Sequence, residues 1–177
     1  MMNKLKTVLY SAPWSARFGI VVILIFSVIS IFAPLIAPYG ETEIIGKSYE
    51  LWSEKHILGT DNLGRDMLSR LIFGARNTIG MALLTTFLAF LIGSITGMIA
   101  AVLGGWVDQI FGRIVDVLMS IPSLIFALLI LSFFGTSVTY LIGTIAILEA
   151  TRVFRLARAT GMNVAVMDFV EVAKLRG

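Results

Sequence analysis

The sequence predicts an all-α protein that crosses a membrane several times, and its composition and apolar runs both lead to this prediction. Its 177 residues are 58% hydrophobic and 14% charged, whereas about a quarter of the residues in an average soluble domain are charged. Four apolar runs each approach the roughly 20 residues that a helix needs to cross the hydrocarbon core of a bilayer. The chain has no cysteine, so disulfides and thiolate metal sites are excluded.

Residues 1–37 are predicted to form a cytosolic N-terminus and the first transmembrane helix. The run from Phe18 to Ile36 carries no charge, and Pro34 and Pro38 are expected to end the helix. The run is longer than the apolar core of a secretory signal, and no A-x-A cleavage site follows it. We therefore expect an uncleaved membrane helix.

Residues 38–78 are predicted to be an extracytoplasmic connection that contains an amphipathic helix. Its apolar residues recur at helical spacing, and they are Leu63, Met67, Leu68, Leu71, Ile72 and Ala75. Asp61 or Thr60 is the expected N-cap, and Asp66 and Arg70 are spaced as an i,i+4 ion pair. The helix is too polar to span, so we expect it at the outer membrane surface or packed on the other helices.

The second span, predicted at about residues 79–103, carries a strip of small residues. Ala89, Gly93, Gly97, Ala101 and Gly105 recur at every fourth position. Small residues at this spacing let a second helix backbone approach closely. Static packing is the simpler interpretation of the strip, and a face that moves against a neighbour is the alternative.

The third span, predicted at about residues 114–134, combines a proline with a polar stripe. Asp116, Ser120, Ser123 and Ala127 share one helix face. Pro122 removes a backbone donor, so a kink is expected there. The stripe has two interpretations. Its residues line a substrate pathway, or Asp116 only forms an ion pair with Arg113 at the membrane interface.

The fourth span, predicted at about residues 138–156, contains Glu149, which can pair with Arg152. A carboxylate in a span is typical of proton-coupled carriers, so Glu149 taken alone does not exclude that class of protein. Basic residues fall on one side of the predicted spans, and they are Lys4, Lys6, Arg17, Arg113, Arg152, Arg155, Arg158, Lys174 and Arg176. This side is predicted to be the cytosol, although five basic residues, offset by six acidic ones, lie in the external connection.

Motifs for chemistry are missing from the sequence. It contains no GxxxxGK(S/T), HExxH or GxSxG pattern, so it carries no phosphate cradle, zinc-protease motif or nucleophile elbow. His56 has no carboxylates at ligand spacing, so it is not predicted to bind a metal. The net charge of +3 is explained by the flanks of the spans and does not indicate nucleic-acid binding. We predict a protein that is not an enzyme and needs no cofactor.

Four stretches together resemble the C-type permease subunit of the dipeptide/oligopeptide/nickel family of ABC importers. They are FAPLIAPYG, HILGTDNLGRDMLSRLIFGARNT, GGWVDQIFGRIVDVLMSIPSLIFALL and the terminal DFVEVAKLRG. The second is similar to the family signature LGTDxLGRDxxSRxxxGxR. It matches at Leu58, Gly59, Thr60, Asp61, Leu63, Gly64, Arg65, Asp66, Ser69, Arg70, Gly74 and Arg76. The last resembles the EAA pattern at Glu171, Ala173 and Gly177, with Val172 in place of the second alanine.

The resemblance implies a type I permease with six membrane helices in the bacterial inner membrane, both ends in the cytosol. The chain would supply four of the six helices, so a fragment or truncated gene is expected. The implied partners are a second permease subunit, two cytosolic ATP-binding subunits and an extracytoplasmic solute-binding protein. In the loop 165–177, Glu171, Ala173, Lys174 and Gly177 would couple to the ATPases.

The implied activity is passage of peptides or similar small solutes, and peptide, nickel and glutathione systems share these signatures. Asp116, Ser120, Pro122, Ser123, Gly93 and Gly97 are the candidates for pathway lining or helix packing. Two alternatives remain at this point. One is a self-contained four-helix carrier that uses Glu149 and Asp116, and the other is a membrane scaffold.

Overall fold

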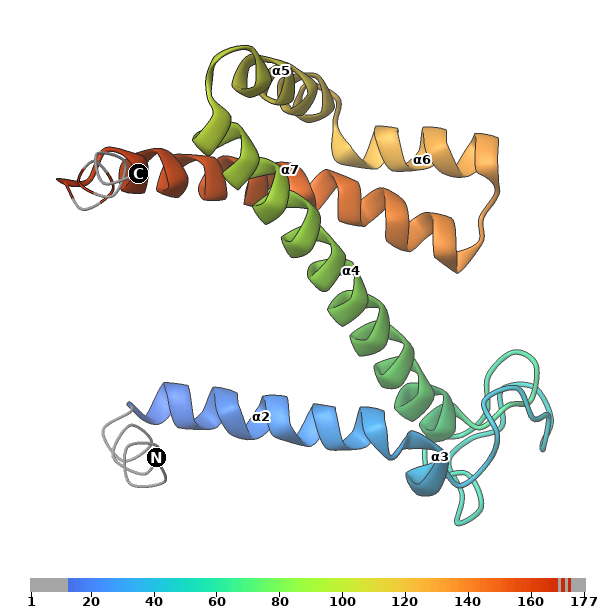
Figure 1. Cartoon of the computed structure of the whole chain (residues 1–177). Helices are drawn as coiled ribbons and strands as arrows, with labels where there is room; N and C mark the ends of the chain where they lie inside the picture. Colours follow the sequence, from blue (N-terminus) through green and yellow to red (C-terminus); the bar gives the residue numbers. More distant parts are fainter. Residues whose placement is uncertain (1–12, 169, 171, 173–177) are drawn as a thin grey trace. The chain divides into compact units, whose positions relative to one another are not determined.

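The computed structural model describes residues 13–168, 170 and 172, and these are helical apart from one long connection and short turns (Figure 1). The helices are α2 (Trp14–Ile31), α3 (Ala33–Ile36), α4 (Met67–Leu103), α5 (Gly105–Ser120), α6 (Ser123–Phe134) and α7 (Val138–Ala165). The chain divides into two compact units, Met1–Gly80 and Met81–Gly177.

In the first unit, α2 is apolar around its whole circumference, and α3 follows after a single residue. The amide N–H of Phe32 closes the last turn of α2 on the carbonyl of Val28 at 2.9 Å. Pro34 lies in the first turn of α3, where a missing N–H is tolerated. The expected interruption near Pro34 is therefore present, and it takes the form of a new short helix.

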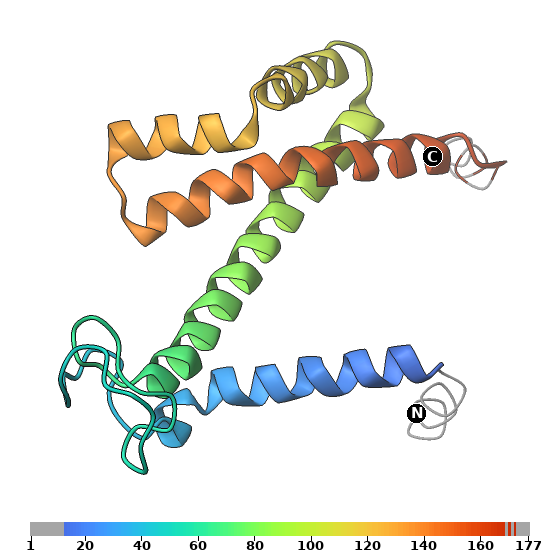
Figure 2. The ribbon, with the colours of Figure 1, turned by 180° about the vertical axis from the view of Figure 1, so that it is seen from behind.

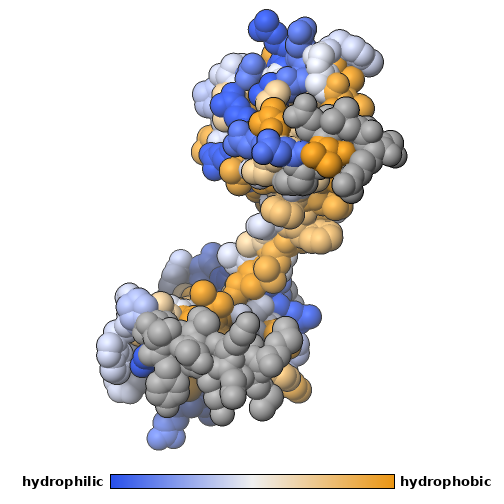
Figure 3. Space-filling model, turned by 60° about the vertical axis from the view of Figure 1, so that its left-hand side comes forward, coloured by the Kyte–Doolittle hydropathy of each residue, from blue (hydrophilic) through white to orange (hydrophobic). Residues whose placement is uncertain are grey.

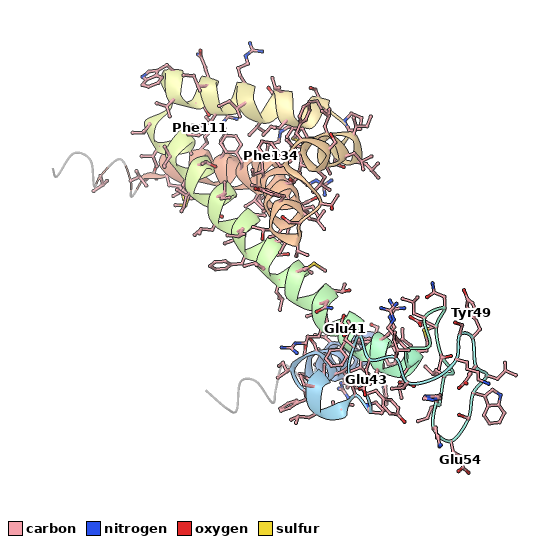
Figure 4. All side chains as sticks on the ribbon, turned by 90° about the vertical axis from the view of Figure 1, so that its right-hand side faces the viewer. Glu41, Glu43, Tyr49, Glu54, Phe111 and Phe134 are labelled. Carbon is pink, nitrogen blue, oxygen red and sulfur yellow. The ribbon has the colours of Figure 1, made fainter. Side chains whose placement is uncertain are left out.

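The connection from α3 to α4 is irregular backbone held by two isolated bridges, Ile44 with Arg65 and Thr60 with Asp66. Gly59 and Gly64 adopt left-handed φ values of 75° and 77°, which a glycine adopts without strain. A Cβ at either position would lie within 2.4 Å of a backbone oxygen. Figure 4 shows Tyr49 and Glu54 on this connection.

Helix α4 corrects the prediction of a separate amphipathic helix. The segment forms the first turns of one continuous helix of 37 residues that begins at Met67, because nothing between this start and the apolar run breaks the helix. Neither Asp61 nor Thr60 caps it. Asp66 precedes the first helical residue, and its Oδ2 accepts the Ser69 N–H at 2.8 Å, as an N-cap does.

In the second unit, α4 packs closely against α7 through the small-residue strip. A Cβ on Gly93 would lie 2.6 Å from the carbonyl oxygen of Ala150, and one on Gly97 would lie 2.7 Å from that of Phe154. Ala89 and Ala101 are buried as well. The close backbone approach predicted from the strip is confirmed at Gly93 and Gly97, whereas Gly105 lies in α5 and nothing lies within 4 Å of a Cβ added to it.

Helices α6 and α7 run side by side in Figures 1 and 2, joined by a short turn. Gly135 takes a φ of 93° in this turn, and the Ser137 side chain caps α7 by accepting the Tyr140 N–H. Helix α7 reaches Ala165, nine residues beyond the predicted end of the fourth span.

The third predicted span is two helices with a 92° bend between α5 and α6. A single kinked helix was expected, but α5 ends at Ser120 and Pro122 precedes α6. Proline lacks the N–H of a continuing helix and pushes the preceding residue, Ile121, into extended backbone. The bend also separates Asp116 and Ser120 from Ser123 and Ala127, so the predicted continuous stripe is wrong.

Among the described helices, α2 and α4 are long and apolar enough to cross a membrane, and α5 with α6 makes a third candidate if the bent pair counts as one span. In α7, every 18-residue stretch contains Glu149, Arg152 and Arg155. An all-α membrane protein is thus confirmed, and four crossings remain a prediction. Figure 3 shows hydrophobic residues on the surface. The exposed apolar side chains of α4 include Leu83, Phe87 and Phe90.

Candidate functional site

The signature residues of the connection between α3 and α4 form a bonded network around the Asp61 carboxylate. Its Oδ1 accepts the backbone N–H groups of Leu63 and Arg65 at 2.8 and 3.0 Å. Its Oδ2 accepts Nε of Arg65 at 2.8 Å and Nη1 of Arg70 at 2.6 Å. The side chain is only 5% exposed, so a buried charge is matched by four donors.

These contacts determine the ionisation of Asp61. Burial opposes the charged form, but the N–H groups of Arg65 and Leu63 and the Arg65 guanidinium outweigh it. Together they lower the pKa of Asp61 from 3.8 to about 2. The carboxylate is therefore charged at any physiological pH.

Asp66 is the second buried carboxylate of the network. Its Oδ2 accepts both the N–H and the hydroxyl of Ser69 at 2.8 Å, and its Oδ1 lies 3.3 Å from Nδ1 of His56. The Ser69 hydroxyl oxygen in turn accepts the Tyr39 N–H at 3.1 Å. The expected Asp66–Arg70 ion pair is thus wrong, because Arg70 reaches back to Asp61.

Thr60 and the two glycines complete the network. The Thr60 hydroxyl donates to the carbonyl of Lys47 at 2.6 Å and accepts the Glu50 N–H at 2.8 Å. Gly59 and Gly64 are buried, and a Cβ added to them would meet the carbonyl oxygens of Glu50 and Gly46, respectively. Gly74 and Arg76 lie further along α4, outside the network. No three His, Asp or Glu side chains converge as a metal site among the described residues.

A second charged group joins α5 to α7. Arg158 donates to both oxygens of Asp108, and Nη2 of Arg155 donates to Oδ1 of Asp116 at 2.9 Å. Of the two interpretations left open for Asp116, the ion pair with Arg113 is therefore not formed, since Asp116 binds across to α7. These residues line a cavity of about 550 Å³ together with Gln109, Gly112, Arg113, Val115 and Phe154.

The other pathway candidates are divided between packing and exposure. Gly93 and Gly97 are buried against α7, whereas Ser120, Pro122 and Ser123 are exposed. The Ser120 hydroxyl donates to the carbonyl of Val117 in its own helix at 2.7 Å. Glu149 accepts from Arg152 at 3.2 Å, as predicted. The structure thus brings Asp116 to α7 and does not bring it together with the serines.

The predicted coupling residues Glu171, Ala173, Lys174 and Gly177 lie outside the described residues. Their role remains a prediction.

Sequence reasoning missed two partners that the fold provides. The sequence offers His56 only as a possible metal ligand, whereas in the structure His56 is a buried partner of Asp66. Asp108 and Arg158 are 50 positions apart, and no local spacing rule connects such a pair.

Two family models match the chain. Residues 93–177 match the binding-protein-dependent transport system inner membrane component. Residues 14–50 match the N-terminal TM domain of oligopeptide transport permease C. The two matches lie on separate parts of the chain and describe the same class of membrane protein.

Individual relatives extend the similarity over nearly the whole chain. The dipeptide transport system permease protein of Haemophilus influenzae is 34% identical over 169 residues, which is 92% of this chain and 57% of the relative. The probable D,D-dipeptide transport system permease protein of Escherichia coli K12 is 33% identical over 98% of this chain and 58% of its own length. The nickel transport system permease protein of the same organism is 30% identical over 94% of this chain and 61% of its own length.

The chain spans about three fifths of the length of these curated relatives. They are named as transport permeases and not as enzymes, in line with the prediction from the missing motifs. The similarity covers the signature residues before α4 as well as α4 to α7. The chain therefore belongs to the family of inner-membrane permeases of binding-protein-dependent transport systems, in the group that contains the peptide and nickel permeases.

Proposed function

We propose that this chain is a permease subunit of an ATP-binding-cassette importer and forms part of the transmembrane pathway for peptides or similar small solutes. The observation that carries the proposal is the similarity to dipeptide, D,D-dipeptide and nickel permeases over more than nine tenths of the chain. The match of residues 14–50 to an oligopeptide permease domain favours peptides as the solute class.

The proposed partners are a second permease subunit, two cytosolic ATPases and an extracytoplasmic solute-binding protein. The family description itself names dependence on a binding protein. Glu171, Ala173, Lys174 and Gly177 are the proposed contacts to the ATPases. ATP-driven movement of the ATPases would then be passed to α7 through this segment.

The proposed topology has a cytosolic N-terminus and four membrane helices, with α5 and α6 as one broken span and α7 as the last. Helix α7 carries charges that are costly in lipid unless they are paired. Glu149 is bonded to Arg152, and Arg155 is bonded to Asp116. This pairing supports a place for α7 within the membrane, facing other helices.

A charge reversal at the proposed coupling segment tests this function. Glu171→Lys, made in the chain expressed with its transporter partners, should abolish co-purification of the ATPases and ATP-dependent dipeptide uptake, because a cation replaces the proposed docking carboxylate. The measurements are the ATPase to permease ratio after purification and uptake of labelled dipeptide into vesicles. Glu54→Lys is the matched control, since Glu54 is an exposed residue of the external connection.

Normal ATPase binding and uptake in the Glu171→Lys variant would refute the proposal. Uptake driven by a proton gradient in the absence of ATP would favour the carrier hypothesis built on Glu149 and Asp116 instead. The control variant should insert, bind the ATPases and transport normally.

A further inference from the structure

Helix α5 has an apolar strip that points away from its partner helix. Trp106, Ile110, Ile114 and Val117 lie on one side of α5 by helical spacing, and their exposed fractions are 72%, 49%, 51% and 62%. On the opposite side, Val115 is buried and the ring of Phe111 lies 6.2 Å from that of Phe154 in α7. Figure 4 labels Phe111 on α5. The strip is therefore the face of α5 that α7 does not cover.

The cavity between α5 and α7 carries surplus positive charge. Three arginines and two aspartates line it. Arg158 is neutralised by Asp108 and Arg155 by Asp116. Arg113 has no carboxylate partner among the residues that the structure describes. One guanidinium at the cavity is thus available to an anion from outside the chain.

Arg113 lies at the border of the cavity and the apolar strip. It is three positions after Ile110 and four before Val117, and it is likewise four after Gln109 and three before Asp116. Residues three and four apart are neighbours on a helix surface. The free guanidinium is therefore flanked by apolar side chains on one side and by polar cavity residues on the other.

We propose that this border is a binding site for an anionic phospholipid, with the lipid phosphate on Arg113 and the acyl chains along the strip from Trp106 to Val117. Guanidinium groups bind phosphate oxygens through paired hydrogen bonds. Tryptophan is enriched at the level of lipid headgroups. A soluble phosphate would use the arginine and leave the apolar strip without a role, so the combination favours a lipid.

The site rests on membership of an inner-membrane family and not on the identity of the solute. In the proposed topology Arg113 faces the cytosol, and the cytoplasmic leaflet attracts basic side chains through its anionic lipids.

Lipid retention by the purified transporter tests the site. The complete transporter is reconstituted with phosphatidylglycerol or with phosphatidylcholine of the same chains, released into detergent, and examined by native mass spectrometry. Wild type should retain phosphatidylglycerol preferentially. Arg113→Gln should bind it about fivefold more weakly, as expected for one basic residue near an anionic surface. Lys55→Gln is the control, because Lys55 is an exposed cation of the connection between α3 and α4 and lies outside the proposed site.

A second variant distinguishes the two sources of phosphate. Trp106→Ser should weaken phosphatidylglycerol retention. Inorganic phosphate should compete with the lipid to the same extent in Trp106→Ser as in wild type. A site for free phosphate would respond to Arg113→Gln alone, and that result would overturn the lipid proposal. Equal retention of both lipids by wild type, or unchanged retention in the Arg113→Gln variant, would also overturn it.

Discussion

The connection between α3 and α4 and the α4–α7 pair are held together by opposite kinds of contact. The connection buries polar and charged side chains, including His56, Thr60, Asp61, Asp66 and Ser69. The helix pair instead buries small and apolar residues, such as Ala89, Ala146, Ala150 and Phe154. Large apolar side chains of α4 remain exposed, among them Leu83 and Phe87.

The difference follows from the surroundings that each region is built for. A short connection without regular structure has too little apolar surface for a core, so hydrogen bonds and ion pairs specify its shape. Helices in lipid gain little from hiding leucine or phenylalanine, because lipid tails are equally apolar. They associate where small residues let the backbones approach.

The largest effect is expected at a glycine of the connection. Gly59→Ala should disrupt the network, because the residue has a φ of 75° and the new Cβ would lie 2.4 Å from the Glu50 carbonyl oxygen. Such strain costs about 1–3 kcal/mol, so trypsin should cleave the connection in the purified protein roughly tenfold faster. Gly74→Ala is the control, since nothing lies within 4 Å of its added Cβ. Equal cleavage of the two variants would contradict this account of the connection.

A glycine of the helix pair should give the next largest effect. Gly93→Ala would place a Cβ 2.6 Å from the Ala150 carbonyl oxygen and push α4 away from α7. Overpacking of this kind lowers the free energy of unfolding by about 1–3 kcal/mol, which a detergent unfolding titration measures. Gly80→Ala in the same helix meets nothing within 4 Å and should be neutral or slightly stabilising. If Gly93→Ala were as stable as this control, the small-residue strip would not be the contact.

Acid should give the smallest effect near neutrality, and in the connection it should act through Asp61. The pKa of Asp61 is about 2 in the fold against an ordinary 3.8, so its stabilisation is complete above 3.8. This stabilisation is lost as the pH falls through the pKa of Asp61 in the folded protein. Amide hydrogen exchange of the connection, corrected for intrinsic rates, should stay constant from neutral pH downward and rise only in this acid window. Asp61→Asn should abolish the transition, and an unchanged transition in that variant would contradict the assignment to Asp61.

Much of the helical unit could be predicted from local spacing. The repeat of Ala89, Gly93, Gly97 and Ala101 indicates a close helix contact because small residues at every fourth position have few other uses in an apolar helix. Pro122 indicates an interruption for a covalent reason. The size of the bend between α5 and α6 was not predictable, since it depends on what each helix packs against.

The ion pairs were predictable only where both partners share one helix. Glu149 and Arg152 are three positions apart and pair as expected. Asp61 with Arg70, Asp66 with His56 and Asp116 with Arg155 each join residues brought near by folding. Spacing rules selected the wrong partners for Asp66 and Asp116, because a carboxylate binds the donors that the whole fold brings to it.

The sequence by itself determined the class of protein, the positions of most helices and the family resemblance, because apolar run length, proline placement and signature residues are local properties. The tertiary structure decided which carboxylate binds which arginine, that α4 runs unbroken from Met67, and that Arg113 has no carboxylate partner among the described residues. Those outcomes depend on contacts between residues far apart in the chain. Their energies are set by burial and geometry, which local spacing does not contain.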